Sequence, residues 1–575
     1  MLKRLLRIPT LVCLLLIVIA AAVFGPLLLD WLDQSSRPRP RLGINLAGPA
    51  DWNTELPFVD LMRFSRAWTS QMRGKPFGSG PALELDENGY PSSLPEGVWA
   101  ESPLISFEGH PWPSGNYTVL YKGRGTLSFG ASATATLEDS PGRMVVTLDS
   151  SKGNLHLSIL ATDPSDHIRD IHVIMPGFEE SWDTDPWHPL FLARWKGVAC
   201  VRFMDFMATN NSAIRTWSER PRVTDTTFAG RGVPLELLID LSNRLGADPW
   251  FCIPHMASDD YVRNFAELVL EKLDRKLKVH IEYSNEVWNS GFRQHKYAAE
   301  KGQELGLAEE PWVAAWLYTS RRSVEIFRIF EDVFKGNKRL VRILPAQSGN
   351  TFMASQILDF QNASRHADVL AIAPYVGLNV AETPDRYNTL TASTVASWDV
   401  RQVLDRLRTR SLPETIESIR SFRKLATDHG LDLVAYEGGQ HLVGILGAEN
   451  NVALTRLLQE TNADPGMGQI YTRLLNAWQD EGGSLFCHFS SVARWTKWGS
   501  WGVLQYYDDD PATSPKLQAL TQWANALGQT IGSPPEEIRE MRLRKEVDTG
   551  NGLRPVKHEE NGHEHQQDQG SRQNS

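Results

Sequence analysis

The sequence predicts an α/β fold in which eight parallel strands close into a (β/α)8 barrel, with an antiparallel β-module inserted near its start. Two observations predict this fold. Eight short apolar runs of strand character recur along the chain, and from residue 198 onward amphipathic segments of helical period alternate with them. Between residues 81 and 176, by contrast, short alternating runs follow one another without a helical segment between them.

The eight predicted barrel strands are spread over most of the 575-residue chain. They begin near residues 42, 198, 249, 279, 340, 369, 431 and 484. The helix predicted at residues 234–245 has Leu238, Leu241 and Leu245 on one face and ends at Gly246. A doubly wound open sheet is the alternative, but no glycine-rich phosphate loop follows any of these strands. The strand count therefore favours a TIM barrel.

The inserted module, residues 81–176, resembles an antiparallel β-sandwich in its pattern. Its alternating runs are separated by Gly, Pro, Asp and Ser turns, a spacing typical of a sandwich or a small barrel. We expect either a carbohydrate-binding surface or a purely structural role for it. The barrel then comprises residues 42–80 and 177–530.

Residues 1–33 are predicted to anchor the chain in a membrane. Basic residues near the start precede an apolar stretch that reaches Leu29, and about 20 apolar residues suffice to cross a bilayer as a helix. The positive charges predict a cytoplasmic N-terminus with the rest of the chain outside the cytoplasm. The alternative is a signal peptide cleaved near residues 20–22, which would give a secreted protein. Residues 34–41 are polar and Pro-rich, as expected of a linker.

Composition argues against several kinds of partner. The net charge is −10 and no basic cluster lies beyond the extreme N-terminus, so nucleic acid is not expected. Cys200, Cys252 and Cys487 lie in apolar strand-like runs, which suits buried free thiols. The alternative is one disulfide bond between two of the three. Their spacing is not that of a metal site, and we expect neither metal nor cofactor. Residues 531–575 are predicted to form a disordered tail.

Two carboxylates are predicted to meet at one end of the barrel. The fourth strand delivers Asn285 and Glu286 at its C-terminal end, and the seventh strand ends in Glu437. The active sites of such barrels lie at the C-terminal ends of the strands. Two glutamates across a cleft are what glycoside hydrolysis requires, because one protonates the leaving oxygen while the other attacks or activates water. For either residue alone, a solvated strand end is the alternative.

The motif Ser-Asn-Glu ending at Glu286 and the motif Tyr-Glu-Gly around Glu437 resemble the catalytic pair of a large clan of retaining (β/α)8 glycoside hydrolases. This clan includes the cellulase and mannanase families, and the resemblance covers residues 42–75 and 177–530. It implies that Glu286 is the general acid/base, that Glu437 is the nucleophile, and that Asn285 contacts the 2-hydroxyl of the sugar under attack.

The resemblance extends unevenly to neighbouring positions. Arg202, at the end of the second strand, resembles the arginine that keeps the nucleophile ionised, since a nearby guanidinium lowers a carboxylate pKa. Tyr375 resembles the tyrosine that donates a hydrogen bond to the nucleophile, although Ala373 stands where many relatives carry histidine. His255, after the third strand, is either a further pocket residue or a structural strand end.

Aromatic side chains are candidates for stacking on sugar rings. The chain has 19 tryptophans, and three of them lie in the Gly-containing loop after the eighth strand. Trp495 and Trp498 are the candidate sugar platform in that loop, and Trp288 is a further candidate in the cleft. Core packing is the alternative use of any tryptophan.

Together these features predict a membrane-anchored, retaining β-glycoside hydrolase that acts on a polysaccharide or oligosaccharide outside the cytoplasm. Its partners would be a β-linked glycan and the membrane. The alternative is a non-hydrolytic carbohydrate-binding or glycan-assembly protein, transglycosylase-like, on the same barrel.

Overall fold

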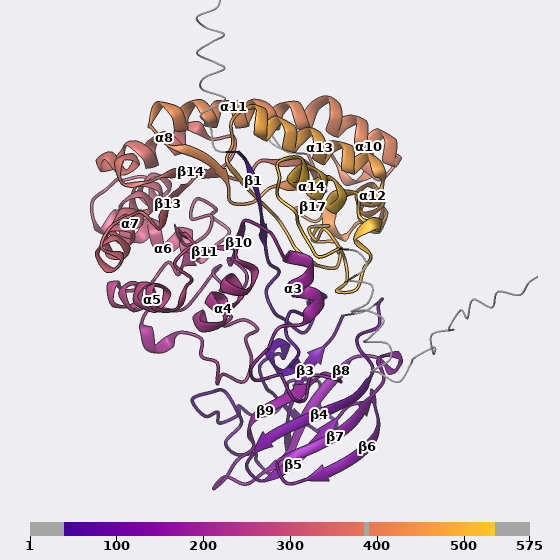
Figure 1. The fold of residues 1–575 in the computed structure, drawn as a ribbon. Coiled ribbons are helices and arrows are strands. Elements are labelled where there is room, and N and C mark those ends of the chain that lie inside the picture. Colours follow the sequence, from indigo (N-terminus) through magenta and orange to yellow (C-terminus); the bar gives the residue numbers. More distant parts are fainter. Residues whose placement is uncertain (1–38, 108, 385–389, 535–536, 538–575) are drawn as a thin grey trace, which may run out of the picture.

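The computed structural model describes residues 39–107, 109–384, 390–534 and 537, and it contains a closed barrel of parallel strands above a β-sandwich (Figure 1). The predicted fold class is confirmed, and every predicted barrel strand is present. In order around the barrel the strands are β1 (Arg41–Asn45), β10 (Cys200–Arg202), β11 (Asp248–Ile253), β12 (Val279–Tyr283), β13 (Leu340–Pro345), β14 (Val369–Ile372), β16 (Asp432–Ala435) and β18 (Leu485–His488). Pairing of β1 with β18 closes the ring.

Alternation along each strand divides the apolar side chains between two regions. In β11, Trp250 and Cys252 belong to a cluster inside the barrel, whereas Phe251 and Ile253 pack outward in the main core under the helices. The neighbouring strand β12 follows the same alternation, because Cys252 lies opposite Glu282 in the ladder. Odd and even positions of one strand therefore serve different purposes, and only the interior positions reach the axis of the barrel.

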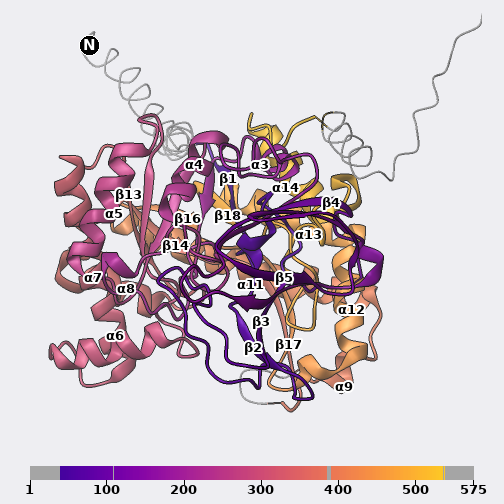
Figure 2. The ribbon, with the colours of Figure 1, turned by 90° about the horizontal axis from the view of Figure 1, so that it is seen from below.

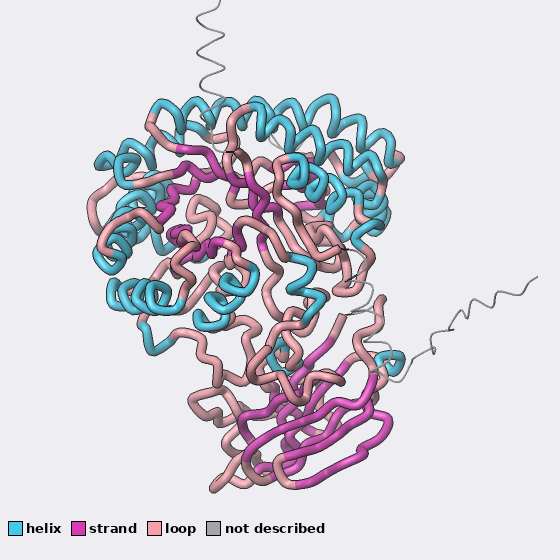
Figure 3. The backbone as a smooth tube through the Cα atoms, in the orientation of Figure 1, coloured by secondary structure: helices cyan, strands magenta, loops and turns pink. Residues whose placement is uncertain are grey.

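Helices surround the strands, as the tube in Figure 3 shows. They arise where apolar residues recur at helical spacing, and α4 ends at Gly246, whose φ of 63° suits glycine. The helices are α3 (Pro189–Trp195), α4 (Leu235–Leu245), α5 (Asp259–Lys272), α6 (Arg293–Glu304), α7 (Pro311–Phe334), α8 (Thr351–Asp359), α9 (Ala392–Val395), α10 (Val400–Arg406), α11 (Leu412–Asp428), α12 (Val452–Ala463), α13 (Pro465–Asp480) and α14 (Pro515–Ala526). A π-helical turn, η5 (Leu407–Ser411), joins α10 to α11.

Two further strands extend the barrel wall at its C-terminal end. They are β15 (Tyr375–Ala381), just after β14, and β17 (Gly439–Ile445), just after β16, and they pair in parallel over their full lengths. We call this pair the β15–β17 ribbon.

The inserted module is a sandwich of two four-stranded antiparallel sheets, seen in front of the barrel in Figure 2. One sheet has the order β2-β3-β8-β5 and the other β6-β7-β4-β9. The strands are β2 (Thr69–Met72), β3 (Val98–Ile105), β4 (Gly115–Lys122), β5 (Gly125–Phe129), β6 (Ala133–Ser140), β7 (Arg143–Leu148), β8 (Leu155–Thr162) and β9 (Arg169–Ile174). Because β2 pairs with β3, the sheets begin before residue 81, in a stretch that the sequence had assigned to the barrel.

The predicted membrane anchor of residues 1–33 lies outside the described residues, as do most of the predicted linker at 34–41 and most of the predicted tail at 531–575. Within the part of the chain that the structure describes, no helix has both the length and the apolar character needed to cross a bilayer. The described cysteines Cys200, Cys252 and Cys487 are buried and free, so no disulfide links them.

A buried carboxylate, Asp60, ties β9 of the sandwich to the segment that leads from β1 of the barrel into the sandwich. It accepts hydrogen bonds from the backbone amides of Met62 and Val173 and contacts His172 at 2.8 Å and Arg63 at 3.1 Å. Burial opposes the charge of Asp60, but the contacts with Arg63 and His172 outweigh it and hold the pKa of Asp60 below its usual value. The ionised carboxylate is therefore part of the joint between the two domains.

Replacing Asp60 by Asn should lower the free energy of unfolding by about 1.5–3 kcal/mol at neutral pH, since hydrogen bonds to a charged group are lost. A lowered pKa contributes its full stabilisation above the pKa of the unfolded state and loses it as the pH falls further. The difference in unfolding free energy between wild type and Asp60→Asn should therefore narrow as the pH falls below about 4. Denaturant titrations at several pH values measure it. Asp332→Asn, which breaks the exposed pair with Arg263, is the control and should change little. Equal losses in both variants would contradict the role of Asp60.

Candidate functional site

The candidate site lies where several barrel strands end. Arg202 is the last residue of β10, Asn285 and Glu286 follow β12, and Glu437 follows β16. Ser284 and Glu286 have φ values of 58° and 42°, in the left-handed region that side-chain-bearing residues seldom adopt. Such backbone strain is typical of functional sites, because the surrounding structure must enforce it.

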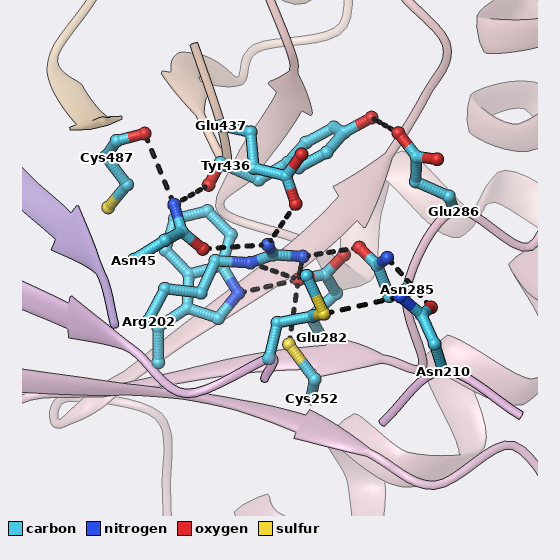
Figure 4. Close-up of polar contacts among 12 residues, drawn as sticks. Asn45, Arg202, Asn210, Cys252, Glu282, Asn285, Glu286, Tyr436, Glu437 and Cys487 are labelled. Carbon is cyan, nitrogen blue, oxygen red and sulfur yellow. Dashed lines mark hydrogen bonds and ion pairs between the residues drawn. The ribbon is translucent and has the colours of Figure 1, made fainter. Parts of the chain in front are cut away.

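Arg202 is the centre of the site (Figure 4). Its side chain is fully buried and donates to Glu282 at 2.9 and 3.1 Å and to Glu437 at 2.8 Å. The same guanidinium donates to the side-chain oxygens of Asn45 at 3.1 Å and Asn285 at 2.8 Å. Its planar fork thus joins the end of β10 to residues of three other strands, β1, β12 and β16, in one arrangement.

Glu437 accepts hydrogen bonds on both carboxylate oxygens. Arg202 donates to one, and the hydroxyl of Tyr375 donates to the other at 2.9 Å. Burial raises the pKa of Glu437, while the charge of Arg202 and the two hydrogen bonds oppose that rise. The contacts expected of Arg202 and Tyr375 are therefore both present in the structure.

Two glycines are needed directly after Glu437. A Cβ on Gly438 would lie 2.5 Å from the ring of Phe486. Gly439 has a φ of 133°, and a Cβ there would approach the Tyr471 hydroxyl to 2.7 Å. Side chains at these positions would displace the turn that carries Glu437 out of the strand.

Glu286 occupies a different environment from Glu437. It accepts hydrogen bonds from the Tyr436 hydroxyl at 3.3 Å and the Asn289 amide at 3.0 Å, and no cationic side chain among the described residues contacts it directly. Burial and the charge of Glu437 raise the pKa of Glu286 to about 7. The two carboxyl groups are thus close enough to influence each other, yet only Glu437 contacts a guanidinium.

The orientation of Asn285 is fixed from both sides. Arg202 donates to its oxygen, and its amide donates to Asn210 at 3.0 Å. Gln294, on α6, donates in turn to Asn210 and to the backbone oxygen of Asn285. The helix that follows β12 therefore supports the residue at the end of that strand.

Other predicted site residues take no part in this network of hydrogen bonds. The ring of His255 packs edge-on against Tyr297, and burial lowers its pKa to about 4. Trp495 donates to a backbone oxygen of its own loop and lies against buried Lys516. Trp498 is 62% exposed, and Trp288 is half-buried against the main core. No hydrogen bond joins any of these four to Glu286 or Glu437.

Sequence reasoning missed several residues beside the pair. Glu282 lies inside β12 and shares Arg202 with Glu437. Asp205 follows β10, and burial together with the charge of Glu437 raises its pKa to about 7. Trp501, in the same loop as Trp498, packs edge-on against Tyr375 with ring centroids 6.0 Å apart. The sequence signal for Asp205 was its position, because it is an acidic residue shortly after the predicted strand that ends at Arg202.

Among the described residues, no group of three or more His, Cys, Asp or Glu side chains is arranged to hold a metal ion.

No family model and no curated protein sequence matches this chain. Solved structures of similar fold include a 4-O-α-L-rhamnosyl-β-D-glucuronidase from Fusarium oxysporum, at 10% identity and TM-score 0.34, with 56% of this chain and 60% of that one covered. The CBM22-1 and GH10 modules of the N-terminal endo-1,4-β-D-xylanase 10B of Clostridium thermocellum match at 10% identity and TM-score 0.33, covering 84% of this chain and 97% of that one.

A modular endo-β-1,4-mannanase from Cellulomonas fimi matches at 12% identity and TM-score 0.32, covering 60% of this chain and 68% of that one. This chain thus spans about three fifths of the Fusarium enzyme. Scores of this size transfer neither an activity nor any residue's role to this chain.

The raised pKa of Glu286 should make stability depend on pH. A carboxyl whose pKa rises on folding stabilises the fold fully below its unfolded value of about 4.5, and that contribution is lost as the pH rises through about 7. Glu286→Gln cannot ionise, so its stability relative to wild type should increase between pH 4.5 and 7, by roughly 1–3 kcal/mol. Denaturant titrations measure this, and Glu300→Gln, at a 57% exposed side chain, serves as control. Parallel curves for wild type and Glu286→Gln would contradict the shift.

Proposed function

We propose that this protein is a retaining β-glycoside hydrolase, with Glu437 as nucleophile and Glu286 as general acid/base. One observation carries the proposal. A buried carboxyl group, Glu437, and a partly buried one, Glu286, stand at the ends of β16 and β12, and burial raises the pKa of both. Only Glu437 contacts a guanidinium, which opposes that rise, whereas Glu286 has a pKa of about 7. Environments that differ in this way divide two carboxyls into an acid and an ionised partner, as glycoside hydrolysis requires.

The reaction would proceed in two displacements. Glu437 attacks the anomeric carbon while protonated Glu286 gives its proton to the leaving oxygen, and a covalent glycosyl-enzyme forms. Glu286, now ionised, takes a proton from water, and that water releases the sugar from Glu437. Arg202 and Tyr375 keep the attacking oxygens of Glu437 in place, and Asn285 is held ready to contact the 2-hydroxyl.

The substrate would be a polysaccharide or oligosaccharide outside the cytoplasm. The apolar stretch near the N-terminus supports this location, as an anchor or as a cleaved signal. Trp501, beside Tyr375, joins Trp288, Trp495 and Trp498 as a candidate to stack on sugar rings.

Replacing Glu437 by Gln should reduce turnover of β-linked glycans by roughly 10⁴-fold or more, since the nucleophile is lost. Release of reducing ends from a panel of β-glucans, mannans and xylans measures this. Glu300→Gln, the exposed control, should keep full activity. NMR of the first product should show the β anomer. Full activity of Glu437→Gln, or an α anomer, would refute the proposal, and wild-type binding without any product would favour a carbohydrate-binding protein.

The rate should also fall as the pH rises through about 7, because Glu286 must carry a proton in the first step. Glu286→Gln should lose this basic limb and should still release an activated aryl leaving group, which needs no protonation. Pre-steady-state release of the aryl group from wild type and variant tests both statements. A basic limb that survives in Glu286→Gln would assign the acid to another group.

A further inference from the structure

A cavity of about 400 Å³ opens beside the candidate site. Tyr375, whose hydroxyl donates to Glu437, is also part of the cavity wall. The β15–β17 ribbon contributes Gly377 and Asn379, and the loop after β13 contributes Ser348. A volume of this size accommodates a small organic ligand. The wall is mainly polar, so a ligand that forms hydrogen bonds is expected rather than an apolar one.

The opposite wall is one face of the long helical segment α10–η5–α11. It contributes residues that recur at helical spacing, namely Arg406, Arg410, Ser411, Glu414, Thr415 and Ser418. The π-helical turn η5 lies within this stretch, and such turns are frequent at functional sites. The Thr415 hydroxyl donates to the backbone oxygen of Tyr375 at 3.0 Å. This contact fixes the helix against the residue that the cavity shares with the candidate site.

Arg406 is the unusual member of this wall. Its neighbours on the helix form ion pairs, since Arg408 contacts Asp405 at 2.8 Å and Arg410 contacts Glu414 at 3.0 Å, although the Nε of Arg408 also lacks a partner. Arg406 makes no hydrogen bond or ion pair with any residue that the structure describes, and its Nε is buried without a partner. A guanidinium stays charged in proteins, so the cavity contains one positive charge that forms no ion pair with a described residue, although the charge of Glu414 acts on it from the same wall.

A second polar group in the wall is also without a partner. The hydroxyl of Ser418 is buried and makes no hydrogen bond with the described residues. Buried donors without partners cost stability unless a ligand or water satisfies them. A ligand with an anionic group for Arg406 and hydroxyls for the serine and asparagine side chains would meet these needs together.

We propose that this cavity binds an acidic sugar unit, with Arg406 contacting its carboxylate, so that the substrate is a uronic-acid-containing glycan. The substrate part of this statement rests on the proposed glycoside hydrolysis, because the sugar unit would belong to the chain that is cleaved at Glu437. The binding part rests on the cavity alone. A planar guanidinium matches a carboxylate with two parallel hydrogen bonds between opposite charges, whereas a neutral hexose offers it no charge.

Binding can be measured without hydrolysis. The methyl β-glycosides of glucuronic, galacturonic and mannuronic acid are titrated into the full-length protein by calorimetry, each beside its neutral parent hexoside. At least one acid should bind about tenfold or more tightly than its parent. Arg406→Gln should abolish that preference. The matched control Arg408→Gln, two residues along the same helix, should retain it. Thermal unfolding of each variant establishes that the fold is intact.

Several outcomes would overturn the proposal. Equal affinities of the wild type for every acid and its neutral parent would overturn it. A preference for a uronide over its parent that survives in Arg406→Gln would also overturn it. Tighter binding of methyl β-glucoside 6-sulfate than of any uronide would reassign the cavity to a sulfate ester. If the uronide preference holds but no glycan is cleaved, the acid-binding cavity stands and the proposed hydrolysis fails. If neutral glycans are cleaved and no preference for a uronide exists, the proposed hydrolysis stands and the acid-binding cavity fails.

Discussion

The buried guanidinium of Arg202 is the interaction on which the rest of the site depends. An ion without solvent is tolerated only when opposite charges and hydrogen bonds replace the water. Here Glu282 and Glu437 supply the charges, while Asn45 and Asn285 supply further acceptors. Arg202 therefore forms ion pairs with two carboxylates, so its positive charge is shared between Glu282 and Glu437. These residues of three other strands are positioned by their contacts with this one side chain.

The division between Glu286 and Glu437 follows from that arrangement. Burial raises the pKa of each group and the charge of Arg202 opposes that rise in both, but Arg202 donates a hydrogen bond only to Glu437. Each carboxyl also accepts a tyrosine hydroxyl, and the bond from Tyr375 to Glu437, at 2.9 Å, is shorter than that from Tyr436 to Glu286, at 3.3 Å. Acid and partner are thus distinguished by their neighbours rather than by their residue type.

The strands and the site differ in how far the sequence predicts them. Apolar runs mark all of the barrel strands because each strand is buried on both faces, and residues such as Glu437 that follow them can be placed from topology. Glu282 could not be found in this way, since a single acidic residue in an apolar strand gives no sign of which way it points. The position of the Trp501 side chain depends on the path of a loop, and that of Arg406 depends on which face of an irregular helix it occupies. No local sequence pattern predicts either.

The pairing register of the β15–β17 ribbon positions both the candidate site at Glu437 and the cavity beside it. Tyr375 begins β15 opposite Gly439, two positions after Glu437, and the ladder continues to Ala381 opposite Ile445. Because side chains alternate along a strand, a slip of one residue would turn the Tyr375 hydroxyl away from Glu437 and would reverse the faces that line the cavity. Neither site can shift along the chain independently of the other, so an insertion within β15 would disable both at once.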